Sequence, residues 1–503
     1  MRRPGGGTGG EEAGSEGLDS GRAAPEAPGS DGSGPLDLLV VGGGPVGLLA
    51  GLLARAEGLR VQVAERRSGP RSDSRAIGIH PPALALMSRL PPPPGEDGAP
   101  AHPSLAHALV ARGTAVRRGH ALGEGGRPLG TLDFGVLDAP WSFVLTVPQE
   151  ATEAILARAL GPVLQWGVEV DPARVAAGDA LPGDPRWVLA ADGRHSPIRQ
   201  ALGVPFRGRS YPHRYLMADL EGPEAACPGV GPDEAAIGIT RGGLVESFPL
   251  RPGVRRWVVE RDPEAGGNGE GPAREARSPE GPAGALASSE EPFPDEPARA
   301  ELARTLATRL GVEVGGARCL MTSTFGAERR RARRVQVGRV LLVGDAAHVV
   351  SPIGGQGMNL GWLHAATTVG TLAEIRRGSA RPAPAFRRLE RRVARGAAVA
   401  GRRAEMNMVL GHRIPAGPAG VLRPVEGWLH GLRTAALQVL LGPIFRRRLA
   451  RTFSMGGFEP PAAAFSREGA EAGVPSPEST SSRSTATPSE GAPPWSPPRS
   501  SSP

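Results

Sequence analysis

The chain contains no lysine, so all 59 of its basic residues are arginines. This absence excludes a P-loop phosphate lysine, a Schiff-base lysine and the lysine that anchors pyridoxal phosphate. Only two cysteines are present, Cys227 and Cys319, and they lie far apart in the sequence. The chain therefore has no CxxC redox centre, no cysteine zinc cluster and no disulfide framework. We expect it to work in a reducing compartment.

Aromatic residues make up only 4% of the 503 residues, but hydrophobic residues make up 39%, enough at this length for more than one core. Three polar stretches, at 1–35, 261–300 and 459–503, are rich in glycine, proline and small residues. We predict two disordered tails and, between them, a mobile insertion at 261–300. The stretches carry net charges of −3, −5 and −2, so the predicted folded part carries +18 rather than the +8 of the whole chain.

The sequence also lacks an apolar run suited to span a membrane. Residues 38–54 carry no charge but include five glycines, which favours a strand, a turn and a helix over a membrane span. Residues 435–445 are too few to span and include Pro443. We expect a soluble, cytoplasmic protein.

The first motif is a glycine-rich turn. The apolar residues 37–41 read as a buried parallel strand, and they run through 42–47 (GGGPVG) into a helical stretch. Gly42 allows the tight turn, Gly44 lets the backbone approach a pyrophosphate, and Gly47 lets the helix pack on the strand. A second strand ends at Glu65, 23 residues after Gly42, near the spacing at which an acid binds a ribose hydroxyl. This pattern predicts a site for FAD or NAD.

The second motif joins a strand end to another glycine-rich turn. The block at 338–348 contains a buried strand that ends in Gly344 and Asp345, whose carboxylate is placed to accept hydrogen bonds from a polyol. Residues 351–359 (SPIGGQGMN) form a turn that opens a helix. The backbone N–H groups and helix dipole of this turn would stabilise negative charge on a reduced flavin ring.

Four blocks together resemble the FAD-dependent aromatic hydroxylases, single-component flavoprotein monooxygenases of the p-hydroxybenzoate hydroxylase type. The blocks occur in family order and lie at 42–47 with Glu65 and Arg66, at 74–80, at 191–199 and at 344–359. The resemblance covers about 36–455 and implies an α/β fold. A Rossmann-type FAD-binding domain would carry an inserted, mainly β-sheet substrate domain and a C-terminal helical segment. The implied parts are FAD-binding segments at 36–110, 141–205 and 321–375, substrate-domain segments at 111–140 and 206–320, and C-terminal helices at 376–458.

The resemblance also implies which residues hold the cofactor. The ADP half would contact the first motif, Arg75 would lie near the pyrophosphate, and Gln149 would contact the flavin. Asp192 and Gly193 match the family's DG motif, which is linked to FAD and NAD(P)H binding. Asp345 would bind the ribityl chain, and the second turn would face the isoalloxazine. The implied residues are Gly42, Gly44, Pro45, Val46, Gly47, Glu65, Arg66, Arg75, Gln149, Asp192, Gly193, Asp345, Pro352, Gly355, Gly357, Met358 and Asn359.

The implied activity is an NADPH- or NADH-dependent monooxygenase. It would use O₂ to hydroxylate an aromatic or polyketide/quinone-like small molecule through a flavin C4a-hydroperoxide. No catalytic side chain and no metal site are assigned. The family usually has Asp where this chain has His364. Two alternatives stay open: an FAD-dependent reductase or dehydrogenase of isoprenoid-type substrates, and a non-catalytic FAD-binding interaction protein.

Several remaining features receive structural interpretations. Tyr211 and Tyr215 are interpreted as packing residues, and His348 as part of a helix start. The arginines at 329–334 are interpreted as a solvated or NAD(P)H-attracting face rather than a nucleic-acid site. The arginines at 446–448 follow an apolar helix, which leaves weak peripheral membrane contact open.

Overall fold

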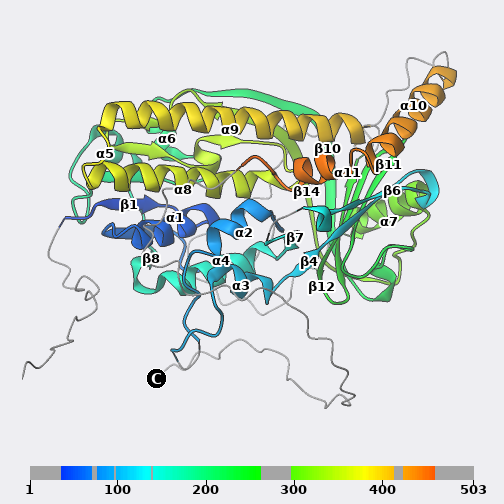
Figure 1. Ribbon diagram of the computed structural model, residues 1–503, viewed down its shortest axis with the longest axis horizontal. Helices are drawn as coiled ribbons and strands as arrows, with labels where there is room; N and C mark the ends of the chain where they lie inside the picture. The colour runs from blue at the N-terminus through cyan, green and yellow to red at the C-terminus, as the bar shows by residue number, and fades with distance from the viewer. Residues whose placement is uncertain are drawn as a thin grey trace, which may run out of the picture. The chain divides into compact units, whose positions relative to one another are not determined.

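The computed structural model contains two sheets and the helices beside them, and all of its described residues fall in the first of two units, Met1–Ala464 (Figure 1). The described residues are 35–70, 76–95, 98–137, 140–261, 296–412 and 423–458. Arg75, and nearly all of both predicted tails and of the predicted insertion, lie outside them. None of the described helices is long and apolar enough to cross a membrane.

A six-stranded sheet forms one half of the molecule. Strand β1 lies between β2 and β9 and pairs in parallel with both. β8 and β16 extend this parallel set on either side, and β15 is an antiparallel edge. The strands are β1 (Leu38–Val41), β2 (Val61–Glu65), β8 (Leu164–Trp166), β9 (Trp187–Ala190), β15 (Gln336–Val337) and β16 (Val340–Leu342). Their short apolar runs suit strands covered on both faces.

Three helices pack beside this sheet: α1 (Pro45–Ala56), α4 (Gln149–Leu160) and α8 (Gln356–Arg376). The Trp362 indole N–H donates to the carbonyl of Pro45 at 2.9 Å, so α8 is held against the start of α1. Gly361 permits this approach, because a Cβ there would lie 2.6 Å from the Val46 side chain.

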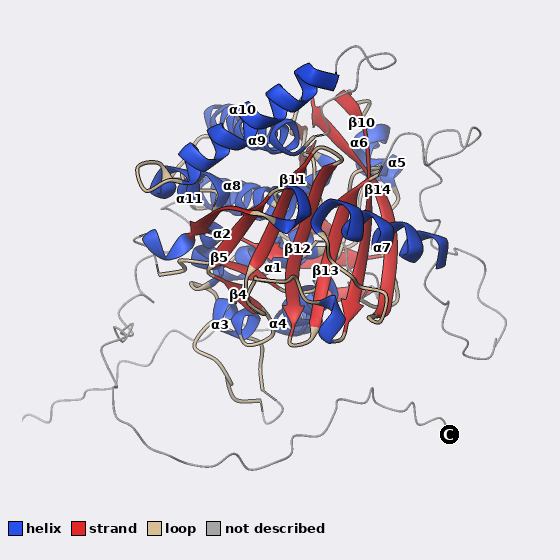
Figure 2. Cartoon of the chain, turned by 90° about the vertical axis from the view of Figure 1, so that its right-hand side faces the viewer, coloured by secondary structure: helices blue, strands red, loops and turns tan. Residues whose placement is uncertain are grey.

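An eight-stranded, mainly antiparallel sheet forms the other half, in the order β17-β14-β10-β13-β12-β11-β5-β6. Its face toward the viewer in Figure 2 is crossed by α7 (Glu296–Leu310). The strands are β5 (Arg118–Leu122), β6 (Pro128–Asp133), β10 (Phe206–Glu221), β11 (Ala235–Thr240), β12 (Gly243–Arg251), β13 (Val254–Glu260), β14 (Arg318–Ala332) and β17 (His348–Val349).

Side chains along each of these strands point alternately to the two faces of the sheet, so each face has its own hydrophobic core. Leu216 and Trp257 point to the α7 side and pack with Leu306. Tyr215 and Met217 point to the opposite side.

The other elements connect and cover the two sheets. A third sheet, of three strands in the order β3-β7-β4, packs against β12, where the Thr146 hydroxyl donates to the Pro249 carbonyl at 2.5 Å. The remaining elements are β3 (Gly78–Ile79), β4 (Thr114–Val116), β7 (Val144–Thr146), α2 (Pro81–Met87), α3 (Leu105–Val110), α5 (Pro172–Ala177), α6 (Pro197–Ala201), α9 (Pro382–Gly411), α10 (Arg423–Leu441), α11 (Arg446–Phe453) and the 3₁₀ turns η1 (Glu124–Gly126), η2 (Phe134–Val136), η3 (Gly161–Val163), η4 (Pro223–Ala225) and η5 (Gly344–Ala346).

The predicted fold class is confirmed: an α/β FAD-domain fold with a second, mainly β-sheet part and C-terminal helices. The segment boundaries differ locally from those expected. β14 continues past 320 to Ala332 because its antiparallel ladder with β10 continues as far as Phe206. Residues 296–300, placed in the insertion by the sequence analysis, begin α7, whose Leu302, Leu306 and Leu310 are buried against the sheet.

Candidate functional site

The first glycine-rich turn joins β1 to α1. Gly42 has φ +111°, and a Cβ there would lie 2.5 Å from the carbonyl oxygen of Ala191. A Cβ on Gly47 would lie 1.9 Å from the carbonyl oxygen of Gly42. Gly44 differs, because a Cβ there would meet nothing within 4 Å. The outer two glycines therefore serve packing, while the middle one borders open space.

The start of helix α1, which follows this turn, has the features of an anion-binding site. Pro45 occupies the first turn of α1, and no side chain caps the helix at Gly44. The free N–H groups of the first turn and the positive end of the dipole are thus left for a phosphate. This geometry matches the predicted role of 42–47.

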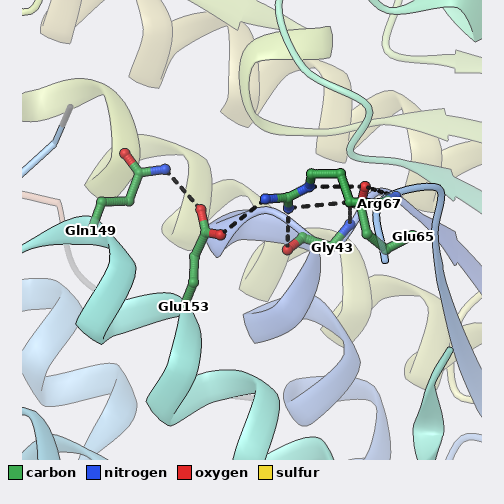
Figure 3. A network of polar contacts seen from close by, with 5 residues as sticks. All are labelled: Gly43, Glu65, Arg67, Gln149 and Glu153. Atoms are coloured by element: carbon green, nitrogen blue, oxygen red, sulfur yellow. Dashed lines mark hydrogen bonds and ion pairs between the residues drawn. The ribbon is translucent and has the colours of Figure 1, made fainter. Parts of the chain in front are cut away.

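Glu65, at the end of β2, is held by a polar network (Figure 3). Its carboxylate accepts the backbone N–H of Gly43 at 2.5 Å and the Nε–H of Arg67 at 3.0 Å. Burial alone raises the pKa of Glu65, but the hydrogen bonds from Arg67 and Gly43 outweigh burial and the net shift of the pKa is downward. Glu65 is therefore an ionised acceptor beside the turn.

Arg67 is the member of this network that the sequence analysis missed. Its guanidinium also bonds the Gly43 carbonyl at 3.1 Å and the Glu153 carboxylate at 3.4 Å. The predicted Arg66 is exposed instead. The strand pattern does not separate the two, because β2 ends at Glu65 and both arginines lie in the bend that follows it.

Gln149 begins α4 and extends the network (Figure 3). Its amide donates to Glu153 at 2.8 Å, and its carbonyl accepts the Ala76 N–H at 3.1 Å. The side chain therefore fixes the start of the segment that leads into β3, directly after Arg75. The predicted flavin contact of Gln149 remains a proposal.

The DG block follows β9. Asp192 accepts the Ile198 N–H through Oδ2 at 3.1 Å, while Oδ1 is buried with no partner among the described residues. Burial raises the pKa of Asp192. A buried oxygen without a donor needs one from elsewhere, and a bound cofactor would supply it.

Arg199 ties the DG block to the Gly-Asp block. It is 4% exposed and donates to the carbonyls of Ala346 and Arg194, at 3.0 and 2.9 Å. Its guanidinium also lies 3.8 Å from the ring centroid of Phe206. The sequence analysis quoted Arg199 without a role, and its role is to hold the two blocks together.

Asp345 lies in the 3₁₀ turn η5 directly after β16. Its side chain is exposed to solvent, yet desolvation raises its pKa to about 6. No described residue donates a hydrogen bond to it. Gly344 has φ +61°. A Cβ on Gly344 would contact the side chain of Val46, so the Gly-Asp motif packs against the first glycine-rich turn.

The second turn leads into α8. Gly354 and Gly355 have φ +89° and +64°, and no side chain caps α8 at Gly355. Pro352 and Gly355 are exposed, and Gly357 and Met358 are partly exposed. The free N–H groups of this turn therefore border accessible space, as the predicted isoalloxazine contact requires.

Asn359 holds this turn in place. Its amide donates to the carbonyls of Gly78 and Gly355, at 2.8 and 3.0 Å, and its oxygen accepts the His80 N–H at 2.8 Å. The side chain is fully buried and these three bonds occupy it. Any cofactor contact of Asn359 would therefore be through its backbone.

His348 and His364 form a buried pair. The expectation that His348 lies at a helix start is wrong: it lies in β17, paired with Arg331 of β14. Its Nε2 lies 3.0 Å from Nδ1 of His364. Burial lowers the pKa of His348 to about 4 and that of His364 well below its usual value. Both imidazoles are therefore neutral. Position 364, where the family usually has Asp, carries no charge in this chain.

One cluster bears on the expectation of no metal site. His213, Glu260 and His412 lie together, with Nδ1 of each histidine 2.7 or 3.3 Å from the Glu260 carboxylate. The imidazoles stack 3.3 Å apart at 12°. An imidazole nitrogen binds a metal along its lone pair, in the ring plane, and an ion between stacked rings lies outside both planes. Glu260 is hydrogen-bonded to His213 and lies only within ion-pair distance of His412.

FAD fits the residues described so far. An uncapped helix start borders open space at Gly44, an ionised Glu65 lies beside it, and Asp192 presents a buried oxygen that has no partner among the described residues. An uncapped glycine turn completes the set at Gly355. Each part of FAD thus has residues that suit it: the phosphates, the ribose, the ribityl hydroxyls and the flavin ring.

Comparison with known proteins agrees with this reading. Residues 36–402 match the FAD binding domain family. The chain belongs to this family. The assignment to the FAD-dependent aromatic hydroxylases is confirmed by its relatives.

Two curated relatives and one solved structure illustrate the similarity. Rifampicin monooxygenase of Streptomyces venezuelae is 30% identical over 341 residues, covering 65% of this chain and 61% of that protein. The 6-methylpretetramide 4-monooxygenase of Streptomyces rimosus is 31% identical over 361 residues, covering 68% and 57%. The p-nitrophenol 4-monooxygenase of Pseudomonas putida shares the fold, with TM-score 0.63 and 20% identity over 84% of this chain and 98% of that one. The chain spans about three-fifths of the length of the two curated relatives.

Proposed function

We propose that this flavoprotein is an FAD-dependent monooxygenase that uses NADPH or NADH and O₂ to hydroxylate an aromatic or polyketide/quinone-like small molecule. The observation that carries the proposal is the meeting of the two motifs. Gly344, which positions Asp345, faces Val46 of the first turn, so the ribityl and phosphate ends of one cofactor would lie along one cleft. The monooxygenase names of its relatives support the reaction class.

The chain's own residues would hold and orient the cofactor. The start of α1 would hold the pyrophosphate and Glu65 the adenosine ribose. Asp345 would accept hydrogen bonds from the ribityl chain, and the turn before α8 would donate N–H groups to the ring. The bound flavin would take hydride from NAD(P)H and activate O₂.

The substrate would lie beyond this turn. Ile353, inside the turn, packs with Tyr215, Leu244 and Met408 on the face of the eight-stranded sheet opposite α7. This cluster is apolar and partly aromatic, which suits a ring-shaped substrate. Apolar walls would also exclude water from the reacting atoms.

The test is turnover by the FAD-loaded chain. Flavin reduction by NADPH and NADH is measured with phenols, naphthoquinones and quinone precursors, and product is collected under labelled O₂. The proposal expects faster reduction with a substrate and label in the product. Reduction without label in any product would favour an isoprenoid-type reductase or dehydrogenase. Bound FAD that NAD(P)H never reduces would favour a non-catalytic interaction protein.

We also propose weak peripheral membrane contact through the C-terminal helices. Val439, Ile444 and Phe445 are 64%, 85% and 36% exposed, and the exposed arginines 446–448 follow directly. Apolar side chains beside arginines suit an anionic bilayer surface. Co-sedimentation with phosphatidylserine vesicles, absent with phosphatidylcholine and lost in Ile444→Asp, would support it. Equal sedimentation of the variant would contradict it.

A further inference from the structure

Helices α8 and α9 lie side by side (Figure 1), and a cavity of about 520 Å³ lies between them. One face of α8 lines it, with residues at helical spacing from 360 to 367, and α9 lines it from 392 to 403. Gly457 and Phe458, after α11, complete the lining. None of the residues assigned to FAD lines this cavity. Its volume is within the range of small-molecule sites.

The walls of this α8–α9 cavity are largely apolar. Leu360 and Leu363 come from α8, Val399 from α9, and the Phe458 ring from the segment after α11. Gly396 of α9 keeps the space open, because a Cβ there would lie 3.5 Å from the Leu360 side chain and 3.8 Å from the Phe458 ring. These surfaces suit the hydrocarbon part of a ligand.

The cavity carries positive charge. Arg403 is partly buried and its Nη2 donates to the Gly456 carbonyl at 2.9 Å, while its Nη1 is buried without a partner among the described residues. Arg392 and Arg395 also line the cavity and are exposed, so they add two positive charges where it meets solvent. No acidic side chain is among the described residues that line it. A buried guanidinium N–H without an acceptor is unfavourable, so an anion in the cavity would be stabilised.

His364 supplies a second unpartnered group. It lines the cavity and is 4% exposed, and its Nε2 has no partner among the described residues. Its Nδ1 lies 3.0 Å from Nε2 of His348. A neutral imidazole carries a proton on one nitrogen only. When His348 donates to His364, Nε2 of His364 therefore carries a proton and is a donor toward the cavity. An Asp at this position, as is usual in the family, would instead place a negative charge there.

We propose that the α8–α9 cavity binds a small aliphatic carboxylate, at a site separate from the flavin. The carboxylate accepts hydrogen bonds from Nη1 of Arg403 and Nε2 of His364. Its hydrocarbon chain lies against Leu360, Leu363 and Phe458. A carboxylate suits the cavity because its two oxygens match the two unpartnered groups, and hydrogen bonds to an ionised acceptor are strong. The inference does not depend on the proposed function.

The test is the binding of octanoate and of its uncharged counterpart octanamide to the FAD-loaded chain, measured by calorimetry. Octanoate should bind at least about tenfold more tightly than octanamide, because only its charged oxygens strengthen the two hydrogen bonds. Arg403→Gln removes the buried guanidinium and should reduce this preference to within about threefold.

His364→Asp tests the second group. The aspartate keeps an acceptor for His348 but adds a negative charge to the cavity. Octanoate should then bind at least about tenfold more weakly, because like charges repel strongly away from bulk water, while octanamide should lose less than about threefold. Gly396→Leu favours the helical conformation of α9 and fills the cavity, so binding of both ligands should be lost.

Arg388→Gln is the matched control. Arg388 is an exposed residue of α9 that does not line the cavity, so its loss should change neither affinity. FAD content and far-ultraviolet circular dichroism confirm that each variant is folded. The inference is overturned if the wild-type chain does not bind octanoate or shows no preference for it. It is also overturned if Arg403→Gln and His364→Asp bind octanoate as tightly as the control, because octanoate would then lie at another site.

Discussion

The side-chain oxygen of Asn359 accepts a hydrogen bond from the backbone N–H of His80 at 2.8 Å, across 279 residues of sequence. The same amide donates to Gly78 and Gly355. One buried side chain thus joins β3 to the turn that would face the flavin.

Asn359→Asp should weaken this junction. The aspartate keeps an acceptor for His80 but loses both donors and places a negative oxygen beside the Gly78 and Gly355 carbonyls. Each unsatisfied buried carbonyl costs about 1–3 kcal/mol, so urea unfolding should show a loss of at least that size. FAD affinity should fall as well. Unchanged unfolding would mean that the turn is held by other contacts.

Glu65→Gln should weaken FAD binding by about tenfold. The amide retains an oxygen but loses the charge that strengthens hydrogen bonds from ribose hydroxyls. It also leaves Arg67 with a weaker partner. Quenching of FAD fluorescence during titration of the apoprotein measures the affinity. Glu313→Gln is the control, and a variant that binds FAD as tightly as the control would contradict the ribose role.

The affinity for FAD should depend on pH through Asp345. Its pKa without ligand is raised to about 6, and ribityl hydrogen bonds favour the ionised form. Bound FAD therefore lowers this pKa, so affinity is highest above pH 6 and falls as pH drops below it, by up to about tenfold per unit. Asp345→Asn should bind more weakly above pH 6 and lose this dependence. An identical pH profile in the variant would assign the effect to another group.

Glu246 should make the fold less stable at alkaline pH. Its folded pKa is raised to about 7 from 4.5, so the folded state binds the proton more tightly than the unfolded chain. Stability is then full below pH 4.5 and is lost as pH rises through 7, by about 3 kcal/mol.

Glu246→Gln should remove this loss. Urea unfolding at pH 5 and pH 8.5 measures the difference, and the variant should unfold at higher urea than wild type only at pH 8.5. A variant that is less stable at both values would show that Glu246 has a partner that stabilises the fold.

The local motifs were predictable because each one is contiguous. The turn at 42–47, the strand ending at Glu65 and the turn before α8 lie where their residue types require, since tight turns and helix starts depend on neighbouring residues. Arg67 was missed because it lies in the bend after β2, where no strand pattern shows that it, rather than Arg66, bonds Glu65.

The contacts between blocks could not be predicted from the sequence. Arg199 reaching Ala346, Trp362 reaching Pro45 and Asn359 reaching His80 depend on how distant segments approach one another. The predicted segment boundary at 320 could not be corrected from the sequence either. β14 continues to Ala332 because it pairs there with Phe206, the first residue of its antiparallel partner β10.

The sequence by itself determined the class of cofactor, since glycine, acid and strand spacing encode phosphate and ribose binding within short segments. It also excluded lysine chemistry and cysteine redox chemistry. Only the tertiary structure decided which carboxyls are partnered and which are not. Asp219 and Glu246 are equally acidic in the sequence, but an arginine stands across the strand from one and valine and isoleucine from the other. Burial and the presence of a donor are properties of the assembled sheet.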